Sequence, residues 1–216
     1  MPGSEVDGAD EIHHVIREYY EAKVRRHGAT PRGVDWENEP MQQLRFVQLL
    51  KLVDFSRPFS LTDLGCGYGA LLAFIEGRFP QAVFRYAGID VAPGMVRRAR
   101  RVHGERPHAV FRVASAPLEA TDYCLASGIF NVQLEVRLET WEAMIERTLH
   151  DMSRRSTRGF AFNFMADWPG PPSPAGLYRC LPERWVRFCE SALGVEIEVL
   201  DRYRMREFTL LARKRE

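Results

Sequence analysis

The chain has 216 residues, of which 45% are hydrophobic and 27% charged, values typical of one globular domain with a sizeable core. Thirty basic residues against 29 acidic ones give a formal net charge of +1, which favours neither nucleic acid nor an anionic membrane as a partner. No apolar stretch is long enough to span a bilayer, and the polar N-terminus lacks a signal core. We therefore expect a soluble, cytoplasmic protein, and the composition leaves its oligomeric state open.

The first 58 residues contain helix signals and no strand signal. Residues 1–10 are polar and predict a flexible tail, whereas apolar residues recur at helical spacing from Ile12 to about His27. A loop rich in Gly, Pro and Asp follows, and a second amphipathic helix is expected over residues 41–54. Residues 11–58 are thus predicted to form a helical extension or lid in front of a compact domain at residues 59–216.

From residue 59 onward, strand signals alternate with helix signals. Strands are expected at 60–64, 84–90, 109–113, 123–127 and 159–164, with helices at 70–79, from Pro93, around 138–152 and at 182–192. Two further strands, 195–200 and 207–212, are joined by too few residues for a parallel crossover, so the last strand must run antiparallel. The pattern predicts an α/β protein with a doubly wound, Rossmann-like sheet of seven strands.

The turn after the first strand, "LTDLGCGYGA" at residues 61–70, fits two glycine templates. Gly65, Gly67 and Ala70 satisfy G-x-G-x-x-G/A, which places a pyrophosphate at a helix N-terminus. Gly65, Gly67 and Gly69, preceded by Asp63, satisfy D-x-G-x-G-x-G instead. A carboxylate suits the ammonium group of an amino acid and would repel a pyrophosphate. Together with the upstream helices and the antiparallel last strand, this favours the second template.

The second template resembles the first motif of the class I methyltransferases that depend on S-adenosylmethionine (SAM). The stretches "YYEAKVRRHGATPRGVDW", "YAGIDVAPGMVRRAR", "ASGIFNVQL" and "EFTLLARK" extend the resemblance to a bacterial subfamily, over about residues 15–214. The resemblance implies that the upstream helix and the "GVDW" loop cover the cofactor. It would place Tyr19 or Tyr20, and Trp36, beside SAM, although a core aromatic stripe is the alternative for each.

Asp90 ends the second strand, where a carboxylate can accept both hydroxyls of a ribose or cap the helix that follows. Val91 and Met95 are candidates for apolar contact with adenine. The resemblance implies that the positions after the third and fourth strands also line the cofactor. These positions are Ser115, Ala116 and Ser127.

The resemblance implies that the end of the fourth strand, "SGIFNVQLE", faces the methyl group of SAM. Phe130 can offer its ring to the sulfonium, and Asn131 can orient an acceptor or the methionine part of SAM. Glu135 is the nearest carboxylate available as a base, or is a solvated loop residue. The cysteines and histidines show no metal-ligand spacing, and no N-P-P-[FY] stretch follows the fourth strand. We therefore predict methyl transfer to a small metabolite, without a metal.

Three other interpretations stay open. The phrase "SGIFNVQL" also resembles azetidine-2-carboxylic acid synthases, which cyclise SAM and release methylthioadenosine. Phe130, Asn131, Tyr178 and Glu135 would then surround the sulfonium and hold the amine, although Glu135 stands where an amide is expected. A catalytically silent SAM-binding module would keep the glycines and Asp90 and lose the aromatic pocket. A nicotinamide oxidoreductase remains compatible with Asp90 and the first glycine template.

Overall fold

The computed structural model describes residues 5–170 and 175–215. Its strands are β1 (Phe59–Leu64), β2 (Phe84–Asp90), β3 (Ala109–Val113), β4 (Thr121–Ala126), β5 (Ser156–Ala166), β6 (Arg179–Cys180), β7 (Glu196–Leu200) and β8 (Glu207–Arg213). Its helices are α1 (Glu5–His27), α2 (Glu39–Leu49), α3 (Ala70–Arg78), α4 (Pro93–His103), α5 (Leu138–Arg155) and α6 (Pro182–Leu193). Two 3₁₀ turns, η1 (Pro31–Val34) and η2 (Leu50–Leu52), flank α2.

The main sheet has the order β3-β2-β1-β4-β5-β8-β7, and β8 is antiparallel to both of its neighbours. This confirms the predicted fold: a doubly wound Rossmann-like sheet of seven strands whose last strand is antiparallel. The eighth strand, β6, has two residues and pairs with the end of β5, off the main order. A strand of two residues is too short to show an alternation of apolar and polar residues, and the sequence therefore gives no signal for β6.

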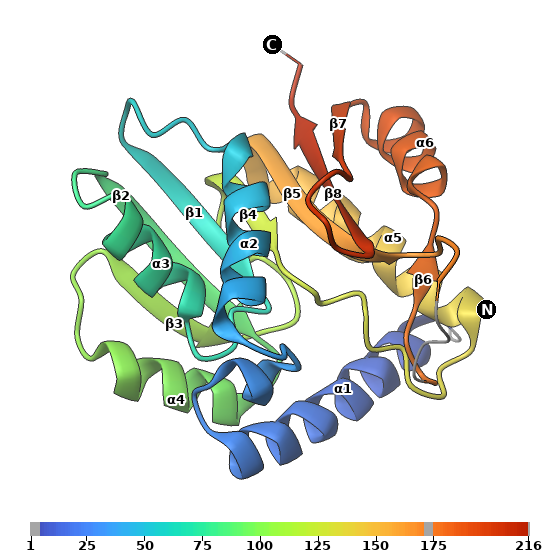
Figure 1. The fold of residues 1–216 in the computed structure, drawn as a ribbon, viewed down its shortest axis with the longest axis horizontal. Helices are drawn as coiled ribbons and strands as arrows, with labels where there is room; N and C mark the ends of the chain where they lie inside the picture. The colour runs from blue at the N-terminus through green and yellow to red at the C-terminus, as the bar shows by residue number, and fades with distance from the viewer. Residues whose placement is uncertain (1–4, 171–174, 216) are drawn as a thin grey trace.

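Helices cover both faces of the sheet (Figure 1). One apolar cluster packs α5 and α6 against β4, β5 and β8, with Trp141, Phe164 and Trp185 fully buried in it. A second cluster packs α2, α3 and α4 against the other face of β1, β2 and β4. Strand β1 is buried at every position, as expected for a central parallel strand covered on both sides.

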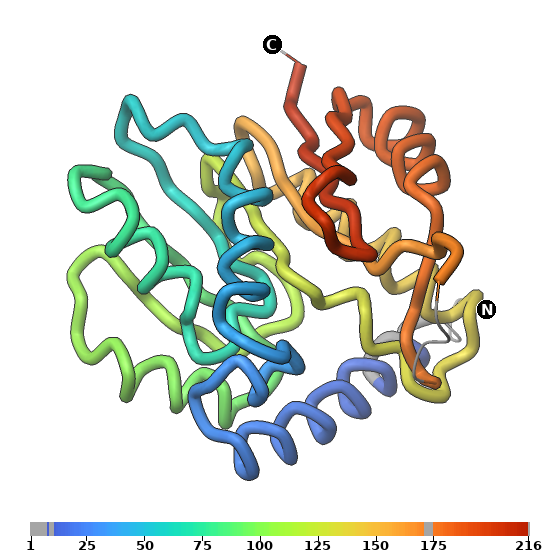
Figure 2. Tube along the Cα trace, viewed as in Figure 1, coloured from blue at the N-terminus to red at the C-terminus, as the bar shows by residue number. Residues whose placement is uncertain are grey.

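Helix α1 lies across the end of the sheet to which the parallel strands point (Figures 1 and 2). Helix α1 begins at Glu5, so residues 5–10 are helical where a flexible tail was predicted. Residues 1–4 of that predicted tail lie outside the described part of the chain. Ile12 is buried in the apolar cluster that includes α5, and this contact holds the N-terminal half of α1 against the domain. The helix extends from that contact toward the N-terminus. Helix α2 likewise ends at Leu49 and passes into η2, short of the predicted residue 54.

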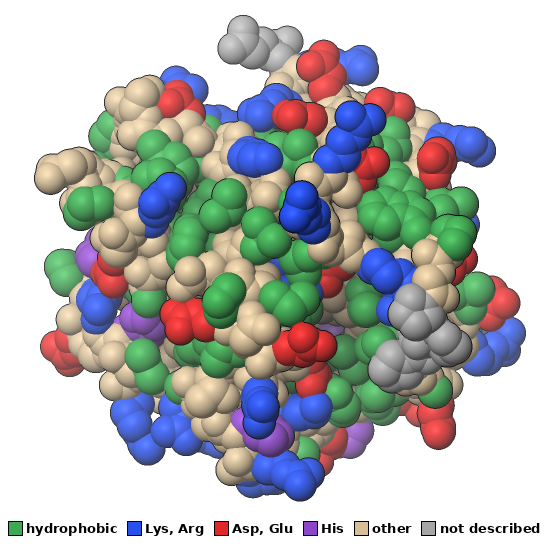
Figure 3. Space-filling model, in the orientation of Figure 1, with side chains coloured by type: hydrophobic (Ala, Val, Ile, Leu, Met, Phe, Trp, Pro, Cys, Tyr) green, Lys and Arg blue, Asp and Glu red, His purple; other side chains and the backbone are tan. Residues whose placement is uncertain are grey.

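The described surface carries charges of both signs. In Figure 3, basic and acidic side chains are interspersed over the visible face. None of the described helices is long and apolar enough to cross a membrane. No group of three or more His, Cys, Asp or Glu residues in the described ranges is placed to hold a metal ion. The four cysteines are free and buried.

Candidate functional site

A cavity of about 470 Å³ opens at the carboxyl ends of the parallel strands, between the sheet, α1 and α2. Parallel α/β sheets place their ligands at this edge, where the strand order reverses. Most of the sequence-predicted site residues line the cavity: Tyr20, Trp36, Asp63, Gly65, Gly67, Asp90, Val91, Met95, Ser115, Ser127, Phe130 and Asn131. Gly69, Ala116, Glu135 and Tyr178 are not part of its wall. Tyr19 does not line it either, so Tyr20 is the tyrosine of that pair that faces the cavity.

The glycine turn is held in a conformation that only glycine adopts easily. Gly65, Gly67 and Gly69 have φ values of 75°, 54° and 84°. A Cβ atom on Gly65 would lie 2.2 Å from Ile129 Cγ2, and one on Gly67 would lie 2.8 Å from Val34 Cγ1. The turn is therefore packed from the β4 side and from the η1 side at once.

The amide groups of this turn are already used within the protein. Gly65 and Cys66 donate to the Ile89 carbonyl at 2.7 and 3.0 Å, and Gly67 donates to Asp90 Oδ2 at 2.9 Å. A phosphate cradle needs such amides free to face the ligand. The turn consequently offers close backbone approach and nearby carboxylates, which suits a cationic ligand better than a pyrophosphate.

Two buried carboxyl groups lie beside the turn. Asp63 is 3% exposed and accepts a hydrogen bond from the Tyr86 hydroxyl. Burial raises the pKa of Asp63 to about 7; the Tyr86 hydrogen bond opposes this rise and the charge of Asp90 adds to it. Burial also raises the pKa of Asp90 to about 6, against the hydrogen bonds from Ala92 and Gly67. Burial disfavours the charged form of both carboxyl groups, and a nearby cation would stabilise that form. The pair therefore fits a cationic group on a ligand.

Residues between positions 20 and 45 also line the cavity. Lys23 of α1 pairs with Asp35 in the turn after η1, and Glu21 accepts a hydrogen bond from the Gly94 amide in the first turn of α4. The Trp36 ring lies under the Arg45 guanidinium, with Arg45 Cζ 3.7 Å from the ring centroid. These contacts hold α1 and the residues after η1 against α2 and α4 beside the cavity.

Trp36 also packs directly on the turn that follows β4. A Cβ atom on Gly128, whose φ is 75°, would lie 2.4 Å from Trp36 Cζ2. We expect Gly128→Ala to lower the free energy of unfolding by more than the ~1–2 kcal/mol that a left-handed alanine alone costs. Urea denaturation measures this loss.

Gly194 provides the matched control, because its φ is 65° and nothing lies within 4 Å of an added Cβ atom. Gly194→Ala is expected to show the backbone strain alone. Equal losses of stability in the Gly128 and Gly194 variants would contradict the Trp36 contact.

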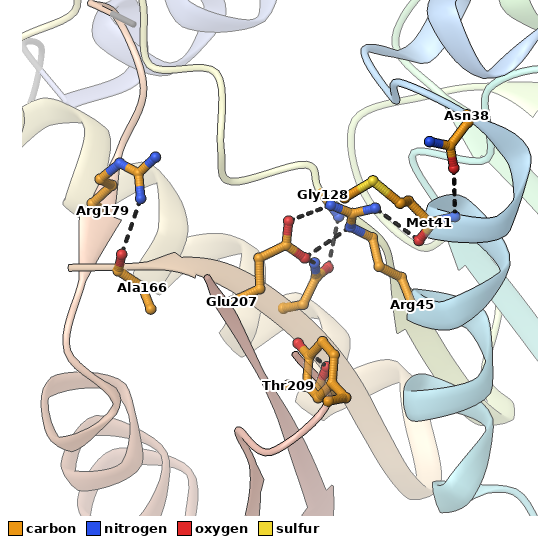
Figure 4. Close-up of polar contacts among 10 residues, drawn as sticks. Asn38, Met41, Arg45, Gly128, Ala166, Arg179, Glu207 and Thr209 are labelled. Atoms are coloured by element: carbon orange, nitrogen blue, oxygen red, sulfur yellow. Dashed lines mark hydrogen bonds and ion pairs between the residues drawn. The ribbon is translucent and has the colours of Figure 1, made fainter. Parts of the chain in front are cut away.

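A chain of buried polar contacts joins α2 to the β4 turn (Figure 4). Arg45 Nε and Nη2 both donate to the carboxylate of Glu207 on β8, with side chains 4% and 5% exposed. Asn163 Nδ2 donates to Glu207 Oε2 at 3.2 Å, while Asn163 Oδ1 accepts the Gly128 amide at 2.8 Å. Asn131 in turn donates its backbone amide to the Gly128 carbonyl. The pair on α2 and β8 thus positions the loop that carries Asn131.

Sequence reasoning missed Arg45, Glu207 and Asn163, although one signal was available for Arg45. Gln42, Arg45 and Gln48 recur every three residues beside the apolar face of α2, and all three are buried. A polar stripe at that spacing on a buried helix indicates a facing polar partner. Asn163 and Glu207 are single polar residues within apolar strands, and no spacing connects them to each other.

Asn131 is a buried polar side chain in the cavity wall. It is 4% exposed, and neither its Oδ1 nor its Nδ2 has a hydrogen-bond partner among the described residues. The hydroxyl of Ser127 is also unpartnered. Buried polar groups are nearly always satisfied, so these atoms indicate a polar ligand between them. Phe130 beside them is fully buried and stacks on Phe164, with 5.2 Å between ring centroids.

The other two predicted catalytic residues lie elsewhere. Glu135 is exposed in the loop before α5. The Tyr178 hydroxyl donates to Glu142 on α5 at 2.8 Å and accepts from Trp185 Nε1 at 3.2 Å. Burial, the largest effect, raises the pKa of Tyr178 well above its ordinary value. Tyr178 therefore joins α5 to α6 instead of facing the cavity.

Comparison with known proteins identifies the family of this chain. A family model described as "Methyltransferase domain" matches residues 61–159. The Mycobacterium tuberculosis protein named "Putative methyltransferase Rv1506c" is 38% identical over 166 residues, covering 76% of this chain and 99% of the relative. Trans-aconitate 2-methyltransferase of Methylobacterium radiotolerans is 35% identical over 86 residues, which cover 38% of this chain and 31% of that enzyme. The chain belongs to the class I SAM-dependent methyltransferases, whose fold binds SAM.

Solved structures share the fold at low sequence identity. The complex of DhpI with SAM and HEP matches with a TM-score of 0.63 and 15% identity over 94% of this chain and 98% of that one. Magnesium protoporphyrin IX methyltransferase from Synechocystis, solved with bound SAH, matches with a TM-score of 0.61 and 14% identity over 94% and 99% of the two chains. At this identity the likeness concerns the fold alone.

Proposed function

We propose that this protein transfers the methyl group of SAM to a small-molecule acceptor. The observation that carries the proposal is the extent of the cavity, whose lining includes the acidic glycine turn, Asn131, and Met165 and Glu207 at the ends of β5 and β8. The cavity thus provides space for a second ligand beside SAM. The residues 11–58 act as a lid over both ligands, since Trp36 and Arg45 line the wall between them.

We assign the acidic end of the cavity to SAM. Asp63 would face the ammonium group of its methionine part, and Asp90 would accept from the ribose hydroxyls, since each oxygen can accept a second hydrogen bond. Val91, Met95 and Ser115 would surround the adenine. The unpartnered Oδ1 and Nδ2 of Asn131 and the Ser127 hydroxyl fit the polar end of the amino acid.

SAM supplies a methyl group that is already bound to a good leaving group. The protein therefore acts mainly by positioning the two ligands and excluding water. Asn131 holds its carboxamide at the junction of the two halves of the cavity, and the Arg45–Glu207–Asn163 contacts fix that loop. In this proposal, the residues between positions 20 and 45 that line the cavity would separate this junction from solvent.

SAM affinity is expected to depend on pH through Asp63. The pKa of Asp63 is about 7 in the free protein, so its carboxyl group is mostly protonated below pH 7. Pairing with the cation of SAM then requires the loss of that proton. The Kd for SAM should rise up to about tenfold for each pH unit below 7 and level off above it. Calorimetry at pH 5.5 to 8.5, in two buffers of different ionisation enthalpy, measures the affinity and the released proton; a flat profile would contradict the assignment.

Incubating the protein with SAM alone and analysing the products by mass spectrometry tests the proposed reaction against its alternatives. Methyl transfer predicts intact SAM without an acceptor and S-adenosylhomocysteine when the acceptor is added. Methylthioadenosine together with azetidine-2-carboxylate would establish SAM cyclisation instead. Of the four residues expected for cyclisation, Glu135 and Tyr178 are absent from the cavity wall, which supports transfer. Absence of SAM binding would refute both reactions.

A further inference from the structure

The two ends of the cavity carry opposite charges. Asp63 and Asp90 line the end at the glycine turn, whereas Arg204 and Arg206 line the end formed by the segment between β7 and β8. Glu207 also lies at the second end, but its carboxylate is bonded to Arg45 through two nitrogen atoms. The carboxylate and guanidinium of that pair neutralise each other, so Arg204 and Arg206 give this end of the wall a positive character.

Arg204 has no structural role that accounts for its position. Its side chain makes no hydrogen bond or ion pair with any of the described residues, whereas sixteen other arginines in those ranges form ion pairs or hydrogen bonds with carboxylates or carbonyls. Its φ is 60°, in the left-handed region that non-glycine residues rarely occupy. Strained backbone of this kind concentrates where a side chain must be held at a ligand.

The guanidinium groups of Arg206 and Arg179 lie close to the end of β5. Arg206 donates to the Trp168 carbonyl, and a Cβ atom on Gly170 would lie 2.7 Å from Arg206 Cζ, so the backbone packs on this guanidinium. Arg179 donates to the Ala166 carbonyl at 3.0 Å (Figure 4), and its Nε is buried without a partner among the described residues. Burial, followed by the charge of Arg206, lowers the pKa of Arg179. The structure therefore gathers cations at the tip of β5.

The wall between these cations and Asn131 is apolar. Met165 at the end of β5 pairs in register with Glu207 and Arg179, and Met205 adjoins Arg206. Met41 of α2 and Leu177 complete this side of the cavity. Thioether side chains adapt to ligands of irregular shape. A ligand that fills this half would contact apolar groups along its body and cations at its far end.

We propose that the methyl acceptor is an organic carboxylate whose carboxyl group binds at Arg204 and Arg206, with its apolar body against Met41, Met165 and Met205. This inference rests on the proposed function and names its substrate class. The opposite charges of the two ends then orient the two ligands, because the cationic methyl donor is attracted to Asp63 and the anionic acceptor to the arginines.

Calorimetry on the protein saturated with S-adenosylhomocysteine tests the proposal. The probes are phenylacetate and hexanoate, each compared with its uncharged amide. We expect each carboxylate to bind at least tenfold more tightly than its amide. Arg204→Gln and Arg206→Gln should each weaken carboxylate binding at least fivefold, with no change for the amides. Added salt should weaken carboxylate binding and leave amide binding unchanged.

Arg202→Gln is the matched control, since it removes a positive charge from the same segment. The Arg202 side chain is 97% exposed, pairs with Asp201 at 3.9 Å and does not line the cavity, so its loss should change no affinity. Equal binding of acids and amides, equal effects of the Arg202 and Arg204 variants, or no carboxylate binding would each overturn the inference. If the unaltered protein does not bind S-adenosylhomocysteine at all, the proposed function itself is refuted.

Discussion

Asp63→Asn is expected to weaken SAM binding by about 100-fold, or ~2.7 kcal/mol, while making the free protein more stable above pH 7. The buried Asp63 carboxylate is the anion placed to pair with the ammonium group. An amide keeps the shape and can still accept from Tyr86, but it carries no charge. Calorimetry with SAM and urea denaturation at pH 8 measure the two effects.

The sign of the stability change follows from the pKa of Asp63. It is raised from 3.8 to about 7 in the folded protein, so the folded state binds the proton more tightly than the unfolded chain does. The stability that this group contributes below pH 4 is lost as the pH rises to 7. The asparagine variant avoids this loss and should gain about 2–4 kcal/mol over the unaltered protein at pH 8.

Asp122→Asn is the control for Asp63→Asn, because Asp122 lies at the opposite end of the strands. It accepts hydrogen bonds from Ser60 and pairs with Arg158 at 3.1 Å. The hydrogen bonds from Ser60 and the charge of Arg158 lower the pKa of Asp122, against the effect of burial. Asp122→Asn should therefore destabilise the protein and leave SAM affinity unchanged. The same affinity in the Asp63 and Asp122 variants would remove Asp63 from the site.

The second large effect is expected for Glu207→Gln, which leaves the buried Arg45 guanidinium without its counter-ion. Removing one partner of a buried ion pair costs about 3–5 kcal/mol, and urea denaturation should show a loss of this size. Because Glu207 also holds Asn163, and Asn163 holds the Gly128 amide, SAM affinity should fall as well.

Two further variants separate the buried charge from the loss of a contact in general. Glu119→Gln removes an exposed partner of Arg112, whose pair has side chains 49% and 67% exposed, and should cost no more than about 1 kcal/mol. The double variant Arg45→Met with Glu207→Met removes both charges and should recover most of the stability, but not the SAM affinity. A stable single variant would show that Arg45 is solvated or paired in another way.

The polar residues of the site differ in how far the sequence predicts them. Asp63 and Asp90 follow directly from the sequence, because each lies at or next to the end of a buried strand, and strand ends meet at one edge of the sheet. Trp36 followed only from resemblance, since its contact with Gly128 joins residues 92 positions apart. Glu135 follows β4 in the sequence and Tyr178 precedes β6, but neither side chain lines the cavity. Glu135 is exposed to solvent, and the Tyr178 hydroxyl bonds to Glu142 of α5.

The sequence by itself determines the succession of strands and helices along the chain, the glycine turn and the acidic end of the cavity, because these depend on local periodicity and on residues within one or two strands. Only the tertiary structure decides the opposite end. Arg45 meets Glu207 across 162 positions, and Asn163 meets the Gly128 amide across 35, through packing that no local pattern encodes. The arginine end of the cavity likewise arises because the β7–β8 segment folds beside β5, which places charges distant in sequence around one space.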